Sequence, residues 1–350
     1  MKYNHWLSVC LLTLAPLWVA AAPPVDVLST PALQSSLALH AVLQAVSRAG
    51  ERLVAVGERG TVLLSDDNGT SWRQAAVPVS SSLTAVQFAD AHNGWAIGHA
   101  GVVLHSSDGG EHWALQLDGR RLAQLELDAA QAAGDEQRLA AARQGVADGA
   151  DKPLLALAFS DASHGLVVGA YGLALYTADG GSSWTSWAGR LPNPQGLHLY
   201  AVGQASSDVY IAGEQGLLLR SQDGGEHFEA VSTPYEGSYF SLAVQPGGDL
   251  LLGGLRGKVF RSTDGGATFE AVSNPLPISI NDMQLLGDRL LLVNQAGGLL
   301  QASRDHTRLA PLALPPGPPL TAVAQAADGA LVGVGFAGPV RLATPLNAAE

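Results

Sequence analysis

Five aspartates stand in the same short pattern, Ser/Thr-x-Asp-x-Gly-x-x-aromatic, and are the first candidates for chemistry in this chain: Asp67, Asp108, Asp179, Asp223 and Asp264. A carboxylate in such a position could serve as a general acid or as a metal ligand. The neighbouring residue types favour a turn instead, because aspartate accepts hydrogen bonds from backbone N–H groups and glycine supplies a positive φ. The aromatic residue suits the start of the next strand. We therefore predict a structural role for all five residues.

Other reactive side chains form no familiar constellation. His99, His105 and His112 are separated by six and seven residues, which matches no usual spacing of metal ligands. The sequence has no phosphate-binding loop and no serine elbow, and its single cysteine, Cys10, lies near the N-terminus. We expect no catalytic residue, no metal and no cofactor.

A second motif, Gly-x-x-Gly, indicates that the aspartate pattern belongs to a longer repeat. Its second glycines fall at positions 60, 101, 172, 216, 257, 298 and 338, and the copy at residues 295–298 lacks the first glycine. Successive gaps are 41, 71, 44, 41, 41 and 40 residues, which indicates seven repeats and one insertion of about 30 residues. The sixth repeat keeps only a partial aspartate motif, at residues 303–305.

Each repeat has room for four short strands. In the second repeat, β-like runs cover residues 83–88, 94–97, 102–105 and 113–117. This pattern predicts an all-β fold, a seven-bladed β-propeller with Asp-box repeats and one helical insertion. Gly-x-x-Gly would join the second strand of a blade to the third, and the Asp motif would join the third to the fourth. The last repeat has residues for three strands, so we expect residues 25–29 to supply its fourth.

The insertion, residues 118–152, is rich in the helix formers Ala, Leu, Gln, Glu and Arg. Gly134 and Asp135 interrupt this run, and Asp135 is a suitable N-cap for a second helix. We predict a helical hairpin or one kinked helix on the face that carries the Gly-x-x-Gly turns. It is either a tolerated loop extension or a contact surface for a partner.

The same predicted face gathers side chains suited to partner binding. They are Arg59, Arg256, Arg120, Arg121, Arg190, Tyr171 and His99. Five arginines on one face of an acidic protein would form a local region that attracts anionic groups. The alternative is a set of separate, solvated charges.

The N-terminus and the net charge narrow the functional classes. Lys2 precedes an apolar run that ends in small residues, so residues 1–22 predict a signal peptide and export, with an uncleaved anchor as the alternative. Residues 23–350 would form one propeller domain, which we expect to be monomeric. The chain has 31 acidic and 19 basic residues and a formal charge of −12, which disfavours nucleic acid as a partner.

The combination of Gly-x-x-Gly with Asp-Gly-Gly-x-x-Trp in seven repeats behind a signal resembles the photosystem II stability/assembly factor family and its bacterial relatives. The resemblance covers about residues 25–345 and is strongest at residues 57–60 and 65–72. It implies a non-enzymatic propeller that binds and helps to assemble or stabilise a membrane protein complex, in the thylakoid lumen or the periplasm. It also implies an arginine-lined patch, to which Arg59 and Arg256 correspond. The insertion and the incomplete sixth motif depart from the family pattern and leave the client open.

Sialidases also contain Asp boxes, so a sialidase-like glycoside hydrolase or a carbohydrate-binding propeller is the alternative. A sialidase needs three arginines, a Tyr–Glu nucleophile pair and an aspartic acid. Arg190 begins an Arg-Leu-Pro sequence, but this follows the third Asp motif instead of preceding the first. The tyrosines considered for the pair, Tyr200, Tyr210 and Tyr239, have only the loop residue Glu236 nearby in sequence. The sequence therefore favours the non-catalytic reading.

Overall fold

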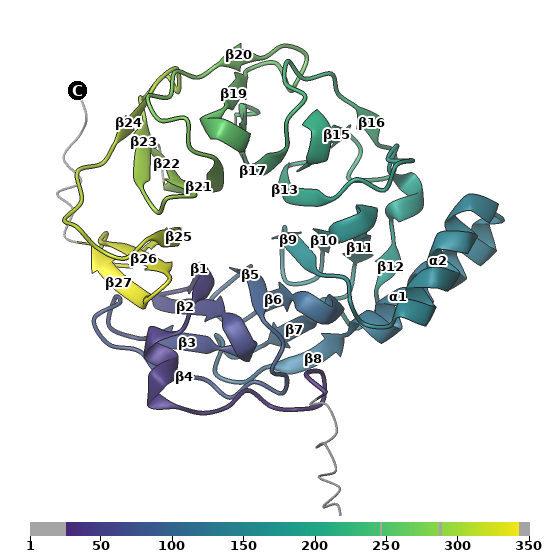
Figure 1. Cartoon of the computed structure of the whole chain (residues 1–350), viewed down its shortest axis with the longest axis horizontal. Coiled ribbons are helices and arrows are strands. Elements are labelled where there is room, and N and C mark those ends of the chain that lie inside the picture. Colours follow the sequence, from purple (N-terminus) through teal and green to yellow (C-terminus); the bar gives the residue numbers. More distant parts are fainter. Residues whose placement is uncertain (1–25, 246, 287–288, 343–350) are drawn as a thin grey trace, which may run out of the picture.

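The computed structural model describes residues 26–245, 247–286 and 289–342 as seven antiparallel sheets arranged around a central axis (Figure 1). Six sheets have four strands and the last has three. The strands of each sheet are consecutive in the chain, and the first strand of every blade lies innermost. The predicted seven-bladed β-propeller is confirmed.

Blades 1 to 4 are built from the first sixteen strands. Blade 1 has β1 (Leu43–Ala49), β2 (Arg52–Gly57), β3 (Val62–Ser65) and β4 (Arg73–Gln74); blade 2 has β5 (Leu83–Phe88), β6 (Gly94–Gly98), β7 (Val103–Ser106) and β8 (Ala114–Leu117). Blade 3 has β9 (Leu154–Phe159), β10 (Gly165–Gly169), β11 (Ala174–Thr177) and β12 (Thr185–Ser186); blade 4 has β13 (Leu199–Ala205), β14 (Asp208–Gly213), β15 (Leu218–Ser221) and β16 (Glu229–Ala230).

Blades 5 to 7 complete the ring. Blade 5 has β17 (Tyr239–Val244), β18 (Leu250–Gly254), β19 (Val259–Ser262) and β20 (Glu270–Ala271); blade 6 has β21 (Ile280–Leu286), β22 (Arg289–Asn294), β23 (Leu299–Ala302) and β24 (Leu309–Pro311). Blade 7 has β25 (Leu320–Gln325), β26 (Leu331–Gly335) and β27 (Gly338–Leu342).

The hydrophobic core lies between neighbouring blades. The second strand of each blade is buried along almost its whole length, since both of its faces meet an adjacent sheet. Trp95 of blade 2, for example, stacks on Phe159 of blade 3 with ring centroids 3.8 Å apart. Burial of such large apolar surfaces holds the ring together without disulfides among the described residues.

The Asp motifs form compact turns between the third and fourth strands. In the blade 3 turn, Asp179 Oδ1 accepts a hydrogen bond from Ser183 N (2.8 Å), and the Thr177 hydroxyl accepts one from Gly181 N (2.8 Å). The other four motifs repeat both contacts. The aromatic residues of blades 2 and 3, Trp113 and Trp184, are buried, and the other three are half-buried. All five aspartates thus hold their own turns.

The two glycines of the Gly-x-x-Gly motif have different structural causes. The first lets two strands approach closely, and the second lies in a turn with left-handed backbone angles. A Cβ atom on Gly57 would lie 2.1 Å from the carbonyl oxygen of Val42, so strand β1 can pass β2 only where the side chain is absent. The chain then turns through a short 3-10 helix, η2 (Glu58–Gly60), in which Arg59 has φ 53° and Gly60 has φ 75°. The turn delivers the chain directly into β3.

The N-terminal segment does not complete blade 7, so the prediction for residues 25–29 is wrong. Residue 25 lies outside the described residues, and Asp26 to Ser29 form a turn. Val27 O accepts a hydrogen bond from Ser80 N, and Leu28 is buried in the core shared by blades 1 and 2. Apolar burial at this site outweighs the addition of a fourth strand to blade 7.

The first and last blades therefore meet through side-by-side packing. The Thr321 hydroxyl donates to Leu43 O (2.7 Å), and the Arg341 guanidinium donates to Asn68 O. A short 3-10 helix, η1 (Ser36–His40), also packs against β27. Among the described residues, no strand is exchanged between the two ends of the chain.

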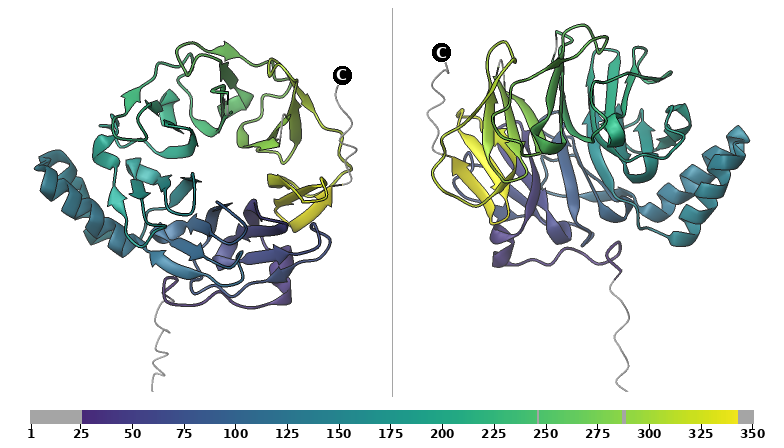
Figure 2. Two further views of the ribbon diagram at one scale, coloured as in Figure 1. Left: turned by 180° about the vertical axis from the view of Figure 1, so that it is seen from behind. Right: turned by 45° about the horizontal axis from the view of Figure 1, so that its top comes forward.

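Two helices occupy the predicted insertion. They are α1 (Gly119–Ala133) and α2 (Glu136–Asp148), which form a hairpin that projects from the side of the ring (Figure 2). Asp118 and Asp135 cap their N-termini, and Ala130, Leu139 and Ala142 form a small core between them. No helix within the described residues is long and apolar enough to span a bilayer. The predicted signal peptide, residues 1–22, lies outside the described residues.

Candidate interaction face

One face of the ring carries the turns that follow the second strands, the connections between blades and the helical hairpin. We call it the turn face. Its 3-10 turns are η2, η3 (His99–Gly101), η4 (Ala170–Gly172), η6 (Glu214–Gly216) and η7 (Leu255–Gly257), and η5 (Ala188–Arg190) lies in the connection from blade 3 to blade 4. Helix α1 contacts both η3 and η5. The Gly-x-x-Gly turns and the insertion therefore share this face.

The third residue of the Gly-x-x-Gly turn is held in the left-handed region in blades 1 to 5. These residues are Arg59, Ala100, Tyr171, Gln215 and Arg256, with φ between 53° and 58°. Such a conformation costs a non-glycine residue free energy and persists only where the surrounding structure imposes it. It directs the side chains of Arg59, Tyr171, Gln215 and Arg256 into solvent.

Arg59 and Arg256 are the two arginines in the 3-10 turns of this face whose guanidinium groups contact no acceptor among the described residues. Their backbone N–H groups are fixed by the hydroxyls of Ser82 and Ser279, each at 3.2 Å. Arg59 belongs to blade 1 and Arg256 to blade 5, and neither blade is the neighbour of the other. The two charges therefore stand at separate sectors of one face.

The other three arginines have local partners. Arg120 pairs with Asp26 (3.1 Å), and Arg121 donates to Gln116 O (3.1 Å). Arg190 pairs with Glu226 (3.2 Å), donates to Gly225 O (2.9 Å) and covers the Trp187 ring at 4.7 Å. The expected single cluster of five arginines is wrong, since ion pairs and packing occupy three of them and the ring separates the remaining two.

The two other candidates of the sequence analysis also lie on this face. His99 is exposed on η3, beside the start of α1. The side chain of Tyr171 is 61% exposed, and its ring centroid lies 4.8 Å from that of His198. The ammonium group of Lys152 lies 5.7 Å from the same Tyr171 ring. The sequence analysis missed His198 and Lys152.

Tyr200 and Phe240 were also missed as components of this face. Every innermost strand has a bulge after its first residue, at the end that leads to the turn face. Tyr200 and Phe240 occupy the bulge positions of β13 and β17 and line the central channel. Aligning the seven repeats would reveal that only these two bulge positions carry aromatic residues.

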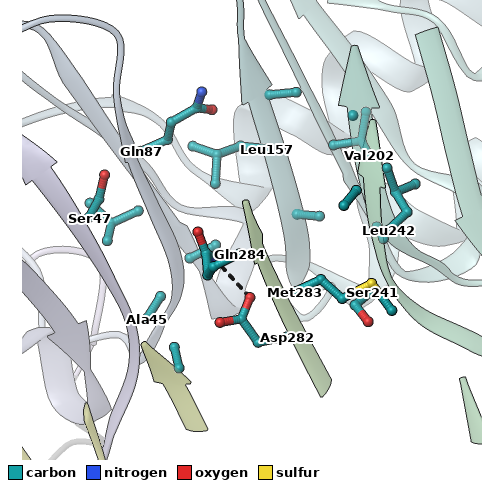
Figure 3. A pocket seen from close by; sticks show the side chains of 18 of the residues that line it. Ala45, Ser47, Gln87, Leu157, Val202, Ser241, Leu242, Asp282, Met283 and Gln284 are labelled. Atoms are coloured by element: carbon teal, nitrogen blue, oxygen red, sulfur yellow. Dashed lines mark hydrogen bonds between the residues drawn. The ribbon is translucent and has the colours of Figure 1, made fainter. Parts of the chain in front are cut away.

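The innermost strands enclose a central channel of about 1000 Å³ (Figure 3). Its lining is dominated by small apolar residues, glutamines and serines, and Asp282 is the only carboxylate among the lining residues. Asp282 accepts a hydrogen bond from Gln284 Nε2 (3.0 Å), and burial raises the pKa of its carboxyl to about 6. The lining thus lacks the pair of carboxylates that most glycoside hydrolases use. The described residues contain no group of three or more potential metal ligands.

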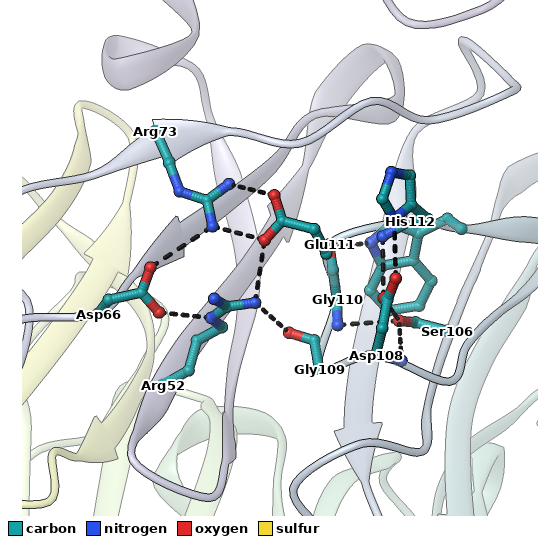
Figure 4. A network of polar contacts seen from close by, with 10 residues as sticks. Arg52, Asp66, Arg73, Ser106, Asp108, Gly109, Gly110, Glu111 and His112 are labelled. Carbon is teal, nitrogen blue, oxygen red and sulfur yellow. Dashed lines mark hydrogen bonds and ion pairs between the residues drawn. The ribbon is translucent and has the colours of Figure 1, made fainter.

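Two arginines on the opposite side of the ring link neighbouring blades. Arg52 and Arg73 bridge Asp66 and Glu111, which joins the Asp-motif turns of blades 1 and 2 (Figure 4). Arg52 also donates to Gly109 O at 3.2 Å. The four side chains are partly exposed, so their contribution to stability is modest. These arginines brace the ring, in contrast to Arg59 and Arg256.

Comparisons with known proteins agree with this geometry. The model of the family described as "Photosynthesis system II assembly factor YCF48" matches residues 67–146 and 139–274, which together exceed half of the chain. The "Photosystem II assembly lipoprotein Ycf48" of Synechococcus sp. (strain CC9902) is 35% identical over 74 residues, which are 21% of this chain and 22% of that protein. The chloroplastic "Photosystem II stability/assembly factor HCF136" of Cyanidioschyzon merolae is 39% identical over 87 residues, or 24% and 18% of the two chains. The matched segments thus span about a fifth of each curated relative.

Solved structures share the fold. A structure described as "YCF48 bound to D1 peptide" has a TM-score of 0.64 at 16% identity and covers 90% of this chain and 100% of that one. YCF48 from Cyanidioschyzon merolae also has a TM-score of 0.64, at 15% identity, covering 87% of this chain and 96% of its own. The repeat pattern, the propeller and the family match lead to one conclusion: the chain belongs to the photosynthesis system II assembly factor YCF48 family.

Proposed function

We propose that this protein is a non-catalytic scaffold that binds a membrane protein complex or one of its assembly intermediates. Membership of the YCF48 family is the observation that carries the proposal. The curated relatives are named as photosystem II assembly factors, and one solved neighbour is described as bound to a D1 peptide. The client of this chain would be photosystem II or, in an organism without it, another membrane complex.

The turn face is the proposed contact surface. Arg59 and Arg256 project from it with unpaired guanidinium groups on a chain of formal charge −12. An anionic segment of a partner would be attracted to these two sites, and the attraction would weaken as salt increases. The side chains of the described channel offer no familiar catalytic arrangement, which supports a binding role.

The proposed compartment is the periplasm, or the thylakoid lumen in a photosynthetic source. The signal pattern of residues 1–22 supports export. The relatives are named as a lipoprotein and as a chloroplastic factor, which agrees with a role at a membrane. We propose that the protein acts there as a monomer, which size-exclusion chromatography with light scattering tests directly.

Affinity purification from intact cells tests the proposed function. The double variant Arg59→Glu and Arg256→Glu should lose the membrane-protein client that the wild type captures. The matched control is Arg304→Glu with Arg308→Glu, which changes the same charge in the incomplete Asp motif of blade 6, away from the turn face. Equal capture by the wild type and the turn-face variant would exclude these arginines, and purification of no membrane protein by the wild type would refute the proposed function.

A further inference from the structure

Four rings form a continuous path across blades 3, 4 and 5 of the turn face. Tyr171, His198, Tyr200 and Phe240 follow one another with centroid distances of 4.8, 6.1 and 5.2 Å. Tyr171 is exposed, and the other three rings are half-buried. The path starts at η4 and ends at the mouth of the central channel. Partly exposed aromatic residues in mutual contact are typical of binding surfaces.

The outer end of the path opens into a second cavity. This space of about 420 Å³ lies between the helical hairpin and blade 3, and Tyr171 and Lys152 line it. Leu122, Ala142 and Leu173 contribute apolar walls. The Lys152 ammonium group already pairs with Asp151 at 3.3 Å, so the cavity has little free charge in this corner. It suits an apolar side chain.

The blade that ends the path also carries a positive charge in its Gly-x-x-Gly turn. Phe240 follows Tyr239, which pairs with Gly254 in the register of β17 and β18. Arg256 lies in the turn that comes directly after Gly254 and contacts no acceptor among the described residues. The path thus begins at an apolar cavity and ends in a blade whose turn carries an unpaired guanidinium group.

Glu214 fixes the middle of the path. Its carboxylate accepts hydrogen bonds from His198 N (2.8 Å) and from the Tyr200 hydroxyl (3.2 Å). The His198 ring nitrogen Nδ1 lies 3.1 Å from the same carboxylate. The two rings are therefore held in place before any ligand binds, which lowers the entropic cost of binding.

The ring orientations indicate the class of ligand. Successive rings are inclined by 50°, 43° and 58°, so they present separate edges and gaps instead of one flat platform. Sugar rings would favour coplanar stacking surfaces, whereas the apolar side chains of a peptide can enter separate gaps. The three centroid distances add up to about 16 Å, so the path is at most as long as about five residues of extended chain.

We propose that this path binds an extended peptide segment of about five residues, with apolar side chains in the second cavity and between the rings and an acidic residue beside Arg256. The inference rests on the proposed function, because it assigns the client segment that the turn face would hold. The aromatic path would add contacts with the peptide that the arginines alone do not provide. The helical hairpin would form one wall of this peptide site.

Fluorescence anisotropy with synthetic peptides tests this assignment. The probe is a labelled six-residue peptide of leucine, alanine, phenylalanine, alanine, phenylalanine and aspartate, made in this order and in reverse. One of the two orders should bind the full-length protein at least about tenfold more tightly than a peptide of alanines ending in aspartate. Tyr200→Ala and Phe240→Leu should each weaken binding about tenfold, and Tyr200→Phe should weaken it less, because the ring remains.

The charged end has its own test. Arg256→Glu should weaken binding of the aspartate peptide about tenfold and leave the matched asparagine peptide unchanged. Arg304→Glu is the control, since Arg304 is exposed in the incomplete Asp motif of blade 6, away from the turn face and from the path. Three results would each overturn the proposal. The alanine peptide could bind as tightly as the aromatic peptide, or Tyr200→Ala could leave binding unchanged in a protein with wild-type circular dichroism. The third result is that the protein binds only a labelled hexasaccharide. If the peptide test gives such a result but the wild-type protein still captures a membrane-protein client from cells, the peptide site is refuted and the proposed function is not.

Discussion

The hydroxyl of Thr177 offers a sharp test of how the Asp motifs stabilise the propeller. Thr177 is buried, with 1% of its surface exposed. Its Oγ1 accepts a hydrogen bond from Gly181 N at 2.8 Å and donates one to Asp179 Oδ1 at 2.9 Å. The same oxygen accepts a longer hydrogen bond from Asp179 N at 3.2 Å. Thr177→Val keeps the shape of the side chain and removes all three contacts.

The size of the expected loss of stability follows from the buried N–H group of Gly181. Without the hydroxyl, the Gly181 N–H group has no acceptor in the turn, and an unpaired buried donor costs about 1–3 kcal/mol. The Asp179 carboxylate remains hydrated, so its lost contact adds little. We expect the free energy of unfolding to fall by about 1–3 kcal/mol and Tm by about 2–8 °C. The conservative control is Thr177→Ser, because four of the five motifs carry serine at this position.

Urea unfolding followed by tryptophan fluorescence and by far-ultraviolet circular dichroism measures the change. Coincident transitions by the two probes establish that a single free energy of unfolding is meaningful for this repeat protein. If Thr177→Val is as stable as the wild type, the hydroxyl does not hold the turn. If Thr177→Ser is destabilised as much as Thr177→Val, the lost methyl packing is the cause, and the reasoning from the buried donor fails.

Three further predictions concern titration and close packing. Hydrogen bonds from Ser71 and Thr268 lower the pKa values of Asp67 and Asp264 to about 2, so their stabilising effect should be present above pH 4 and be lost as pH falls from 4 toward 2; Asp264→Asn should flatten that part of a Tm profile. Burial raises the pKa of Asp282 to about 6, so the free energy of unfolding should decrease as pH rises from 4 through 6. Asp282→Asn should remove this decrease. If the variant and the wild type have the same pH profile, the Asp282 carboxylate is hydrated and its pKa is not raised. Gly57→Ala should lower the free energy of unfolding by about 1–3 kcal/mol, because its Cβ would collide with Val42 O. Gly145→Ala in α2 should raise it by about 0.5–1 kcal/mol, because alanine favours the helix. Urea midpoints that move in the same direction for both variants would contradict this reasoning.

The parts of the fold that the sequence predicts are those with local causes. The Asp motif and Gly-x-x-Gly each complete their turns within a few residues, so their spacing alone reveals seven blades. The path of the N-terminal segment depends instead on burial of Leu28 against a core that distant residues form. No local pattern distinguishes that site from the open edge of blade 7.

The candidate site was less predictable for the same reason. Arg120 is neutralised by Asp26, which lies 94 residues away in sequence, and no spacing rule links the two. The aromatic path joins side chains from three blades, and the contact between Tyr200 and Phe240 exists only after the sheets pack. Composition and motif spacing identify the turn face, but tertiary packing decides which of its groups remain free to bind.

The separate ends of the ring have a consequence for biosynthesis. Each described blade consists of one uninterrupted stretch of chain, and blade 1 needs no strand from the C-terminus. A chain that crosses a membrane from its N-terminus can therefore finish each sheet soon after its residues emerge, without keeping a free strand edge waiting for the last residues. Only the seam between blades 1 and 7 must wait, and its contacts include the Thr321 and Arg341 hydrogen bonds, one from Asp328 N to Asn68 Oδ1, and apolar packing. If the chain is exported as we propose, passage through the membrane and ring closure would be separable events, and the incomplete propeller would be an open arc of finished sheets.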